Sequence, residues 1–557
     1  MRKKKFMYRS QYKWLLLFAF VALYLLPLGL TPLWMPDEVR YAEISREMLA
    51  TGNWVVPHFM GMDYFEKPVL GYWMNNISQL LFGQTNFAAR LAPALSIGLT
   101  GWIAYYFVKS VLQDERKAFY SALVYLSFPL VFGVGTYNTL DSQLTLWMAA
   151  AFASFYFAMQ SKKRSALVGR YLLFGVFCGA AFLTKGFVGL AILVIAIVPF
   201  MILTRQFKQV VGYGTLSILA AVLVALPWSI AVAIQAPDYW NFFFWNENIR
   251  RFESSNAQHL APFWYYIPTL LLAIFPWTVL APHAIAQSFA DKSNKRFFLY
   301  QACCVLLPFI LLSIARGKLA TYIMPLMMPL AILIGCGLVE LVKQKHRIIK
   351  WSVWANLLAF AGIALVLVLV QYQIVGKVEG YLAKEIHTFW FAIGVFLFCA
   401  LLPLLPLNKF DRVPFFLAGP SVALLLLLPF FLPSKVVNNK HPEVFYEQHI
   451  SLIEQDAWVI TNYPGLIGGL GWILDRSDID LLEAYGELKY GVEHSEQQRY
   501  FLYGEFREQL QQRQHSQQVV LAFHSSSEVD PIFRELPTPA QQFQDGNFHL
   551  YIYPKLP

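Results

Sequence analysis

Long apolar segments recur along almost the whole of this 557-residue chain. A helix needs roughly 20 mostly apolar residues to cross a bilayer. Thirteen such segments are found, at residues 13–33, 88–108, 118–136, 143–160, 170–184, 186–204, 210–234, 263–287, 297–314, 319–343, 351–372, 387–406 and 413–432. Charged residues make up 14% of the chain, against about 25% in soluble domains. The pattern predicts an all-α polytopic membrane bundle and excludes a large soluble core.

Basic residues indicate the side of the membrane on which each loop lies. They cluster before residue 14 and in the short loops that follow every second apolar segment. Loops rich in Lys and Arg stay in the cytoplasm, so the N-terminus is predicted to be cytoplasmic. An odd number of spans then places the C-terminus in the periplasm. The net charge of +10 is spread over these loops without forming a stripe, which argues against a nucleic-acid partner.

Residues 433–557 differ from the rest of the chain, because they are polar and rich in Gln around 497–518. Short runs of β-favouring residues are found at Trp458–Thr461, Val519–Phe523 and Phe548–Tyr553. The Gln-rich stretch is interrupted by charged and aromatic residues, which favours a helical surface over disorder. We therefore predict a transmembrane domain over residues 1–432 and a small periplasmic α/β domain over residues 433–557.

Ionisable and tyrosine residues on the predicted outer side gather at the ends of the apolar segments. They are Asp37, Glu38, Arg40, Tyr41, Tyr64, Glu66, Lys67, Asp141, Lys185, Arg251, His259, Lys318 and Tyr322. Charges at membrane depth are costly and tend to face a cavity that serves function. Anchoring at the membrane interface is the alternative for any single Lys or Arg. Because both signs occur on one side, we predict that these groups converge in a single cavity open to the periplasm.

The first outer loop, residues 34–87, contains an amphipathic pattern. In Val39–Ala50, the residues Tyr41, Ile44 and Met48 share one stripe while the charged residues lie elsewhere. This pattern is typical of a helix that lies in the membrane interface. Asp37 stands at the expected start of the helix, where a capping role is compatible with a catalytic one.

Several strings along the chain resemble a known family. They are WMPDEVRYAEISREMLATGNWVVPHFMGMDYFEKPVLGYW (34–73), GTYNTLD (135–141), LTKGF (183–187), RFESSNAQHLAPFWYY (251–266), ARGKLATYI (315–323), NKHPEVF (439–445) and GELKYG (486–491). The first resembles the first periplasmic loop of GT-C glycosyltransferases, and the whole series is most similar to the bacterial lipid A aminoarabinosyltransferases. The DE pair is common to many GT-C enzymes, whereas the complete series is far more specific.

The resemblance implies a GT-C helical bundle with juxtamembrane helices and a periplasmic C-terminal domain. It also implies transfer of 4-amino-4-deoxy-L-arabinose from undecaprenyl phosphate to the phosphates of lipid A, in the inner membrane of a Gram-negative bacterium. The less anionic lipid A would give resistance to polymyxin and related cationic peptides. The donor lipid, the lipid A acceptor and membrane lipids are the implied partners.

The residue types suit this chemistry. The leaving phosphate needs fixed cations, which Lys185 and Arg251 supply for the donor, and Lys67 and Lys318 for donor or acceptor. The oxocarbenium-like sugar needs a carboxylate, for which the candidates are Asp37 and Asp141. We expect the sugar ammonium to pair with Glu38 or Asp141. Tyr322, Arg40, Tyr41 and Tyr64 complete the predicted substrate-binding set.

Asp37 is the base by resemblance to GT-C enzymes. A phosphate acceptor is largely ionised at neutral pH, since its second pKa is about 6. It needs little deprotonation, so Asp37 is also a candidate for orienting the acceptor or stabilising the sugar. The aromatic runs Trp240–Trp245 and Phe263–Tyr266 suit either an interfacial belt or the wall of a lipid groove.

Glu66 and His259 carry ligand types that suit a divalent metal such as zinc. The resemblance makes a metal near Glu66 plausible, and a structural ion network of Glu66 with Lys67 is the alternative. No other cofactor is expected.

Two further functions fit parts of the pattern. A related GT-C transferase would move another polyprenyl-linked sugar onto protein or glycan, and there a general base would be required. A flippase or transporter of the lipid-linked sugar would place charges near the bilayer midplane, usually in repeated halves. The sequence shows no repeat, and its charges cluster on one side, which favours a transferase.

Overall fold

The computed structural model describes residues 12–250, 259–375, 380–525 and 536–557. The chain forms two compact units. The first contains residues 1–28 and 90–431, and the second contains residues 29–89 and 432–557. The first outer loop therefore groups with the C-terminal segment, and each unit is described by itself.

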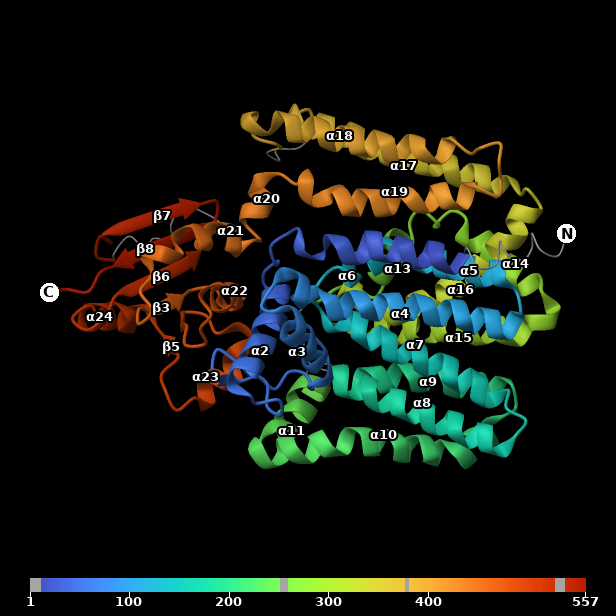
Figure 1. Cartoon of the computed structure of the whole chain (residues 1–557), viewed down its shortest axis with the longest axis horizontal. Coiled ribbons are helices and arrows are strands. Elements are labelled where there is room, and N and C mark those ends of the chain that lie inside the picture. Colours follow the sequence, from blue (N-terminus) through green and yellow to red (C-terminus); the bar gives the residue numbers. More distant parts are fainter. Residues whose placement is uncertain (1–11, 251–258, 376–379, 526–535) are drawn as a thin grey trace. The chain divides into compact units, whose positions relative to one another are not determined.

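The first unit is a bundle of helices (Figure 1). Its main helices are the N-terminal helix Tyr12–Gly29, α4 (Asn86–Leu112), α5 (Glu115–Leu126), α6 (Pro129–Gly135), α7 (Leu140–Met159), α8 (Arg164–Lys185), α9 (Phe187–Leu203), α10 (Phe207–Gln235), α13 (Tyr266–Ala273), α14 (Ala281–Ala290), α15 (Lys295–Ile314), α16 (Met324–Lys343), α17 (Arg347–Gln371), α18 (Ile386–Leu401) and α19 (Val413–Leu427). Each of the thirteen predicted segments overlaps helix, so the predicted class of an all-α multi-pass membrane protein is confirmed.

The predicted count of thirteen spans is not confirmed. Within the described ranges, nine helices are long and apolar enough to cross a membrane, or ten if α5 and α6 form one span bent by 64°. Proline causes the clearest breaks, because it cannot continue a helical hydrogen-bond ladder. Pro129 begins α6, and Pro276 lies between α13 and α14. α9 has only 17 residues.

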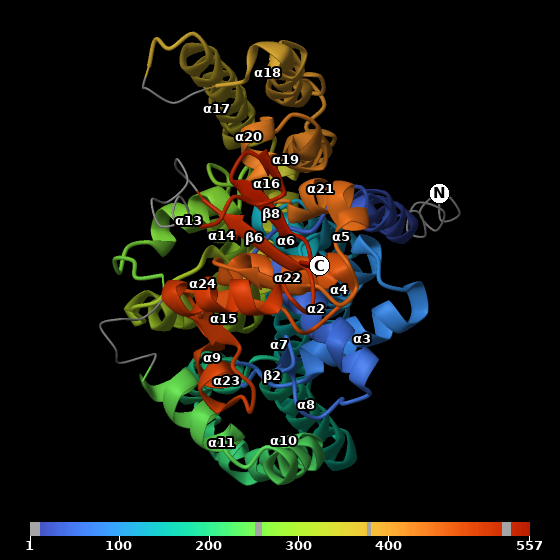
Figure 2. The ribbon, with the colours of Figure 1, turned by 90° about the vertical axis from the view of Figure 1, so that its left-hand side faces the viewer.

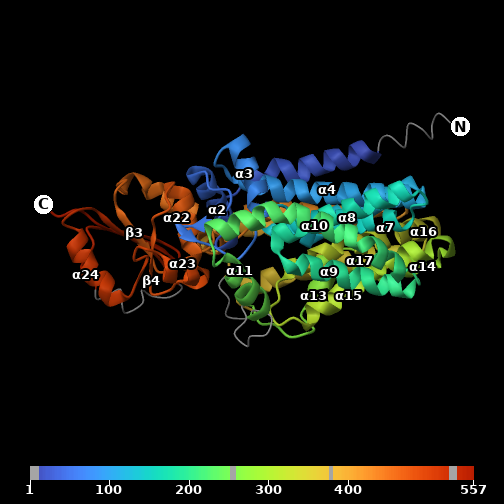
Figure 3. The ribbon, with the colours of Figure 1, turned by 90° about the horizontal axis from the view of Figure 1, so that it is seen from below.

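Helix α16 forms the centre of the first unit. In its apolar window 94% of residues are buried, compared with 22% in α10 and α17. α8 lies alongside α10, as Figures 1 and 3 show. The two helices approach closely because glycines lie at the contact: a Cβ at Gly175 would overlap with the backbone oxygen of Ser217. At this contact Ser217 donates a 2.7 Å hydrogen bond to the backbone oxygen of Tyr171. The peripheral helices expose apolar side chains, as expected of a lipid-facing surface.

In the second unit, α2 (Asp37–Thr51) differs from the predicted interfacial helix. Its charged residues Glu43, Arg46 and Glu47 are buried together with its apolar stripe. α2 packs between α3 (Leu70–Phe82) and α22 (Pro464–Leu474), which cover both of its faces. Periodicity identified the helix correctly but gave no information about the partner that covers its polar face.

Helix α3 has the surface expected of an interfacial helix. It buries Asn75, Asn76 and Gln79, while Leu80 and Leu81 are 68% and 69% exposed. A helix with its polar side in the protein and its apolar side outward suits contact with lipid. A short hairpin, β1 (His58–Phe59) with β2 (Met62–Asp63), separates α2 from α3.

The C-terminal segment folds around a six-stranded sheet of order β5-β4-β3-β6-β8-β7. Its strands are β3 (Trp458–Thr461), β4 (Asp480–Leu482), β5 (Tyr500–Phe501), β6 (Val519–His524), β7 (Gln541–Asp545) and β8 (Phe548–Tyr553). The first four are parallel, and β8 and β7 join antiparallel. All three predicted strands are confirmed. The Gln-rich stretch contains α24 (Tyr503–Arg513), which lies beside the sheet in Figure 2.

Candidate active site

Seven of the predicted site residues fall into two clusters, one in each unit. In the first unit, Lys185 Nζ lies 2.6 Å from Asp141 Oδ1, and their side chains are only 14% and 8% exposed. Asp141 is in the first turn of α7, and Lys185 is the last residue of α8. Each charge therefore complements the dipole of its own helix, because helix N-termini favour anions and C-termini favour cations.

A tyrosine ring completes this cluster. Lys185 Nζ lies 4.7 Å from the centre of the Tyr322 ring, which belongs to the short helix η5 (Ala320–Ile323). A cation over an aromatic face in a desolvated place gains roughly 2 kcal/mol. The structure thus brings together three predicted residues from three separate segments of the sequence, Asp141, Lys185 and Tyr322.

The turn after Lys185 explains why the LTKGF string contains glycine. Gly186 has φ +74°, a conformation that L side chains rarely adopt. A Cβ at Gly186 would also lie 2.5 Å from Cζ of Phe243. The aromatic run Trp240–Trp245 therefore packs over the turn that carries Lys185. There the ring centres of Phe187 and Phe243 are 6.2 Å apart.

Lys318 is held by the backbone. It is 3% exposed, and its Nζ donates to the carbonyl oxygens of Ala315 and, at 3.0 Å, Ala261. Burial lowers the pKa of Lys318. Its backbone N–H also donates to the oxygen of His259. These bonds favour a structural role for Lys318, fixing the loop around Ala261, over direct binding of a phosphate.

The second cluster lies at the start of α2. Pro36, not Asp37, occupies the cap position, and no side chain caps the helix. The predicted capping role of Asp37 is therefore wrong. Asp37 is instead the first helical residue, with its Oδ1 accepting a 2.6 Å bond from Nη2 of Arg40. Its side chain is 42% exposed, so the carboxylate remains accessible to a substrate.

Arg40 is the centre of this second cluster. Its Nη1 donates to Glu487, whose Oε2 also accepts a 3.1 Å bond from the hydroxyl of Tyr64. The guanidinium stands 5.0 Å from the ring of Tyr41. Burial lowers the pKa of Arg40, but Tyr64 and the other hydroxyl and carboxylate groups around it raise it well above its usual value. Arg40 is therefore a permanent cation here.

Two predicted acidic residues have structural partners. Glu38 is fully buried, and its Oε2 accepts a 2.9 Å bond from the backbone N–H of Trp34. Lys67 Nζ donates to the backbone oxygen of Glu66 and lies 3.7 Å from its carboxylate. The Glu66–Lys67 contact is the one expected of a local ion network.

The proposed metal pair remains a prediction. Glu66 belongs to the second unit, and His259 belongs to the first, where it is exposed. Within the part of the chain that the structure describes, no group of three or more His, Cys, Asp or Glu residues is arranged to hold a metal ion. Arg251 lies outside the described residues. The predicted convergence of all site residues in one cavity joins the two units and also remains a prediction.

Sequence reasoning missed Glu487 and the anchor at the far end of α2. Arg46 donates to both oxygens of Glu43, to Asp475 at 2.8 Å and to Ser477 at 2.7 Å. The sequence signal that could have pointed to Glu487 was the GELKYG string, which contains it. Nothing in its spacing pointed to a partner 447 residues earlier.

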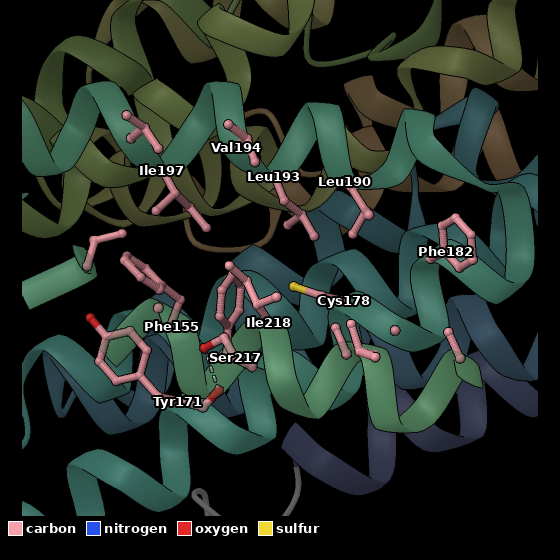
Figure 4. Close-up of a pocket in the computed structure, with 18 residues that line it drawn as sticks. Phe155, Tyr171, Cys178, Phe182, Leu190, Leu193, Val194, Ile197, Ser217 and Ile218 are labelled. Carbon is pink, nitrogen blue, oxygen red and sulfur yellow. Dashed lines mark hydrogen bonds between the residues drawn. The ribbon is translucent and has the colours of Figure 1, made fainter. Parts of the chain in front are cut away.

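A cavity of about 410 Å³ lies among α7, α8, α9 and α10 (Figure 4). Its lining is almost entirely hydrocarbon and aromatic, with Phe155, Cys178, Phe182, Leu193 and Ile197 among the residues that face it. Phe182 lies one helical turn before Lys185 on α8. The cavity has the size of a small-ligand pocket, for which about 300–1,000 Å³ is usual.

Comparisons with known proteins identify relatives in sequence and in fold. Residues 11–243 match the family described as dolichyl-phosphate-mannose-protein mannosyltransferase, and residues 437–552 match the arabinosyl transferase ArnT C-terminal domain. In structure the chain is similar to ArnT from Cupriavidus metallidurans bound to undecaprenyl phosphate, with a TM-score of 0.80, 22% identity and 98% of each chain covered. That similarity shows a shared fold.

Curated relatives are closer in sequence. The undecaprenyl phosphate-alpha-4-amino-4-deoxy-L-arabinose arabinosyl transferase of Aeromonas hydrophila is 42% identical over 91% of this chain and 93% of its own length. The protein of the same name from Erwinia tasmaniensis is 40% identical over 98% of this chain and 99% of its own length. The chain therefore belongs to the family of undecaprenyl phosphate-aminoarabinose arabinosyl transferases and is a glycosyltransferase.

Proposed function

We propose that this chain transfers 4-amino-4-deoxy-L-arabinose from undecaprenyl phosphate to the phosphate groups of lipid A, at the periplasmic face of the inner membrane. The observation that carries the proposal is the buried Lys185–Asp141 pair beside an apolar cavity. A donor made of a charged phosphosugar and a long hydrocarbon chain requires this combination. The names of the relatives support the sugar and its carrier.

The charges suit the two halves of the transfer. When the sugar leaves, the phosphate diester of the donor becomes a monoester and gains negative charge, which the Lys185 ammonium stabilises. The sugar becomes oxocarbenium-like, and a nearby carboxylate stabilises it. Asp141 and Asp37 are suited to that task, whereas Glu38 is committed to the backbone of Trp34.

The ionisation state of the acceptor phosphate explains why the transfer needs no strong base. A phosphate monoester on lipid A is largely ionised at neutral pH, since its second pKa is about 6. It can attack the sugar without losing a proton to the protein. Asp37, with its Oδ1 held by Arg40, is then positioned to orient the acceptor or to stabilise the sugar. When a lipid A phosphate is esterified with the aminosugar, it loses a negative charge and gains the sugar's ammonium. The surface becomes less anionic, which lowers the binding of polymyxin-type peptides.

The function is tested with purified protein, synthetic undecaprenyl phosphate-aminoarabinose and lipid A. We expect mass spectrometry to detect lipid A that carries added aminoarabinose, together with released undecaprenyl phosphate. Parallel reactions replace lipid A with a protein or glycan acceptor. Transfer only to these other acceptors would contradict the lipid A assignment, and movement of the donor between leaflets without product would favour a transporter.

We also propose that the apolar cavity holds part of the undecaprenyl chain. Val194 lines the cavity on α9 and is 58% exposed. Val194→Trp should fill the space and raise KM for the undecaprenyl donor about 10-fold, equivalent to about 1.4 kcal/mol, while KM for a short-chain prenyl donor stays unchanged. Ile202→Trp is the matched control, since Ile202 is also 58% exposed on α9 but does not line the cavity. Equal KM changes for both donors would refute this role.

A further inference from the structure

The C-terminal segment places a carboxylate against the helix that carries Asp37. Glu487, in the short helix η10 (Gly486–Leu488), accepts hydrogen bonds from Nη1 of Arg40 and from the hydroxyl of Tyr64. Nη2 of the same guanidinium donates to Asp37. Arg40 is thus held between two carboxylates, one at the start of its own helix and one from the C-terminal segment.

This contact is not needed to attach α2 to the C-terminal segment. Arg46, two turns further along α2, already bonds Asp475 and Ser477. α22 also packs directly on α2, because a Cβ at Gly468 would lie 3.2 Å from the backbone nitrogen of Arg40. Glu487 is 25% exposed, and Arg40 keeps a second carboxylate partner in Asp37. Neutralising Glu487 therefore leaves the guanidinium paired, and its cost in stability is small.

Glu487 has a larger effect on the orientation of the Arg40 guanidinium than on stability. A guanidinium has a planar fork of donors, and one carboxylate can occupy two of them at once. With Glu487 on Nη1, Arg40 binds Asp37 through Nη2 alone, to Oδ1. Glu487 thus holds the guanidinium in the orientation in which Nη2 reaches Oδ1 and the buried Nε bonds no acceptor among the described residues. Removing Glu487 would release Nη1, so that the guanidinium could turn on the ring of Tyr41 and engage the second oxygen of Asp37 as well.

We propose that Glu487 is a positioning residue for transfer, which acts through Arg40 to keep one oxygen of Asp37 available to substrate. Tyr64 supports it by holding Oε2 of Glu487 from the other side. This inference rests on the proposed function, and it gives the C-terminal domain a direct part in the geometry of the site.

The test compares Glu487→Gln with Glu508→Gln, an exposed carboxylate on α24, using undecaprenyl phosphate-aminoarabinose and lipid A. We expect Glu487→Gln to lower kcat about 10-fold, with KM for the donor and the thermal unfolding temperature nearly unchanged. Glu508→Gln should behave like the unmodified protein. Equal kcat for the two variants, in a preparation whose unmodified protein forms product, would overturn the inference without affecting the proposed function.

A double-mutant comparison separates positioning from a general structural role. In an Arg40→Met background, Glu487→Gln should cause no further loss of kcat, because the group through which it acts is gone. A full additional 10-fold loss in that background would overturn the inference. An unmodified protein that forms no product would refute the proposed function itself.

Discussion

Replacing Asp37 with alanine is expected to lower kcat for transfer by about 100-fold or more, the scale typical of losing one group that stabilises charge in a transition state. The protein should stay folded and inserted, because the Asp37 side chain is 42% exposed and Arg40 keeps its bond to Glu487. Product formation is measured by mass spectrometry and folding by thermal unfolding in detergent. Asp456→Ala removes an exposed carboxylate of the C-terminal segment and serves as the control.

The dependence on pH distinguishes the two roles open to Asp37. If it removed a proton from the acceptor, raising the pH from about 4 to 8 would take the phosphate, whose second pKa is about 6, from almost wholly protonated to almost wholly ionised, and would restore activity to Asp37→Ala. We expect no such recovery, because an orienting or charge-stabilising carboxylate is not replaced by hydroxide. Recovery to near the normal rate would show that Asp37 is a general base. Near-normal transfer by the variant at all pH values would remove Asp37 from the site.

Replacing Lys185 with alanine is expected to abolish detectable transfer. The leaving phosphate would lose the Lys185 ammonium, and the cation–π contact between Lys185 and Tyr322 would be lost. The same change leaves the Asp141 carboxylate buried and unpaired, which costs about 3–5 kcal/mol of stability. Loss of activity alone would therefore not separate catalysis from folding.

A paired variant makes that separation. Lys185→Met with Asp141→Asn removes both charges, so the free energy of unfolding should recover most of what Lys185→Ala loses. Transfer should remain absent in the double variant, because the phosphate still lacks its cation. If the double variant recovered both stability and transfer, the Lys185–Asp141 pair would be a structural ion pair only.

Sequence periodicity predicted the elements of this fold well. Apolar length located the helices, and short runs of β-favouring residues located β3, β6 and β8, because both signals are local. The number of spans was less predictable. Proline breaks at Pro129 and Pro276 and the short helix α9 depend on how neighbouring helices pack, and that information is absent from a hydropathy pattern.

The candidate site was predictable in part for the same reason. Lys185 and Asp141 were identified because charges at the ends of apolar segments are rare and costly, and the structure places them 2.6 Å apart. The burial of α2 and the Arg40–Glu487 contact were not predictable, since each requires a partner hundreds of residues away. The same holds for Lys318, whose buried ammonium is satisfied by backbone carbonyls that no sequence pattern marks.

The most direct test of the account is photo-crosslinking with a donor that carries a photoreactive group on its phosphosugar, followed by mapping of the labelled peptides. The account predicts labels both in the first turn of α2, around Asp37 and Arg40, and at the ends of α7 and α8, around Asp141 and Lys185, with undecaprenyl phosphate competing for both. Labels confined to one of these two places, or found only in the basic loops, would contradict the claim that both groups of charges act on one lipid-linked sugar.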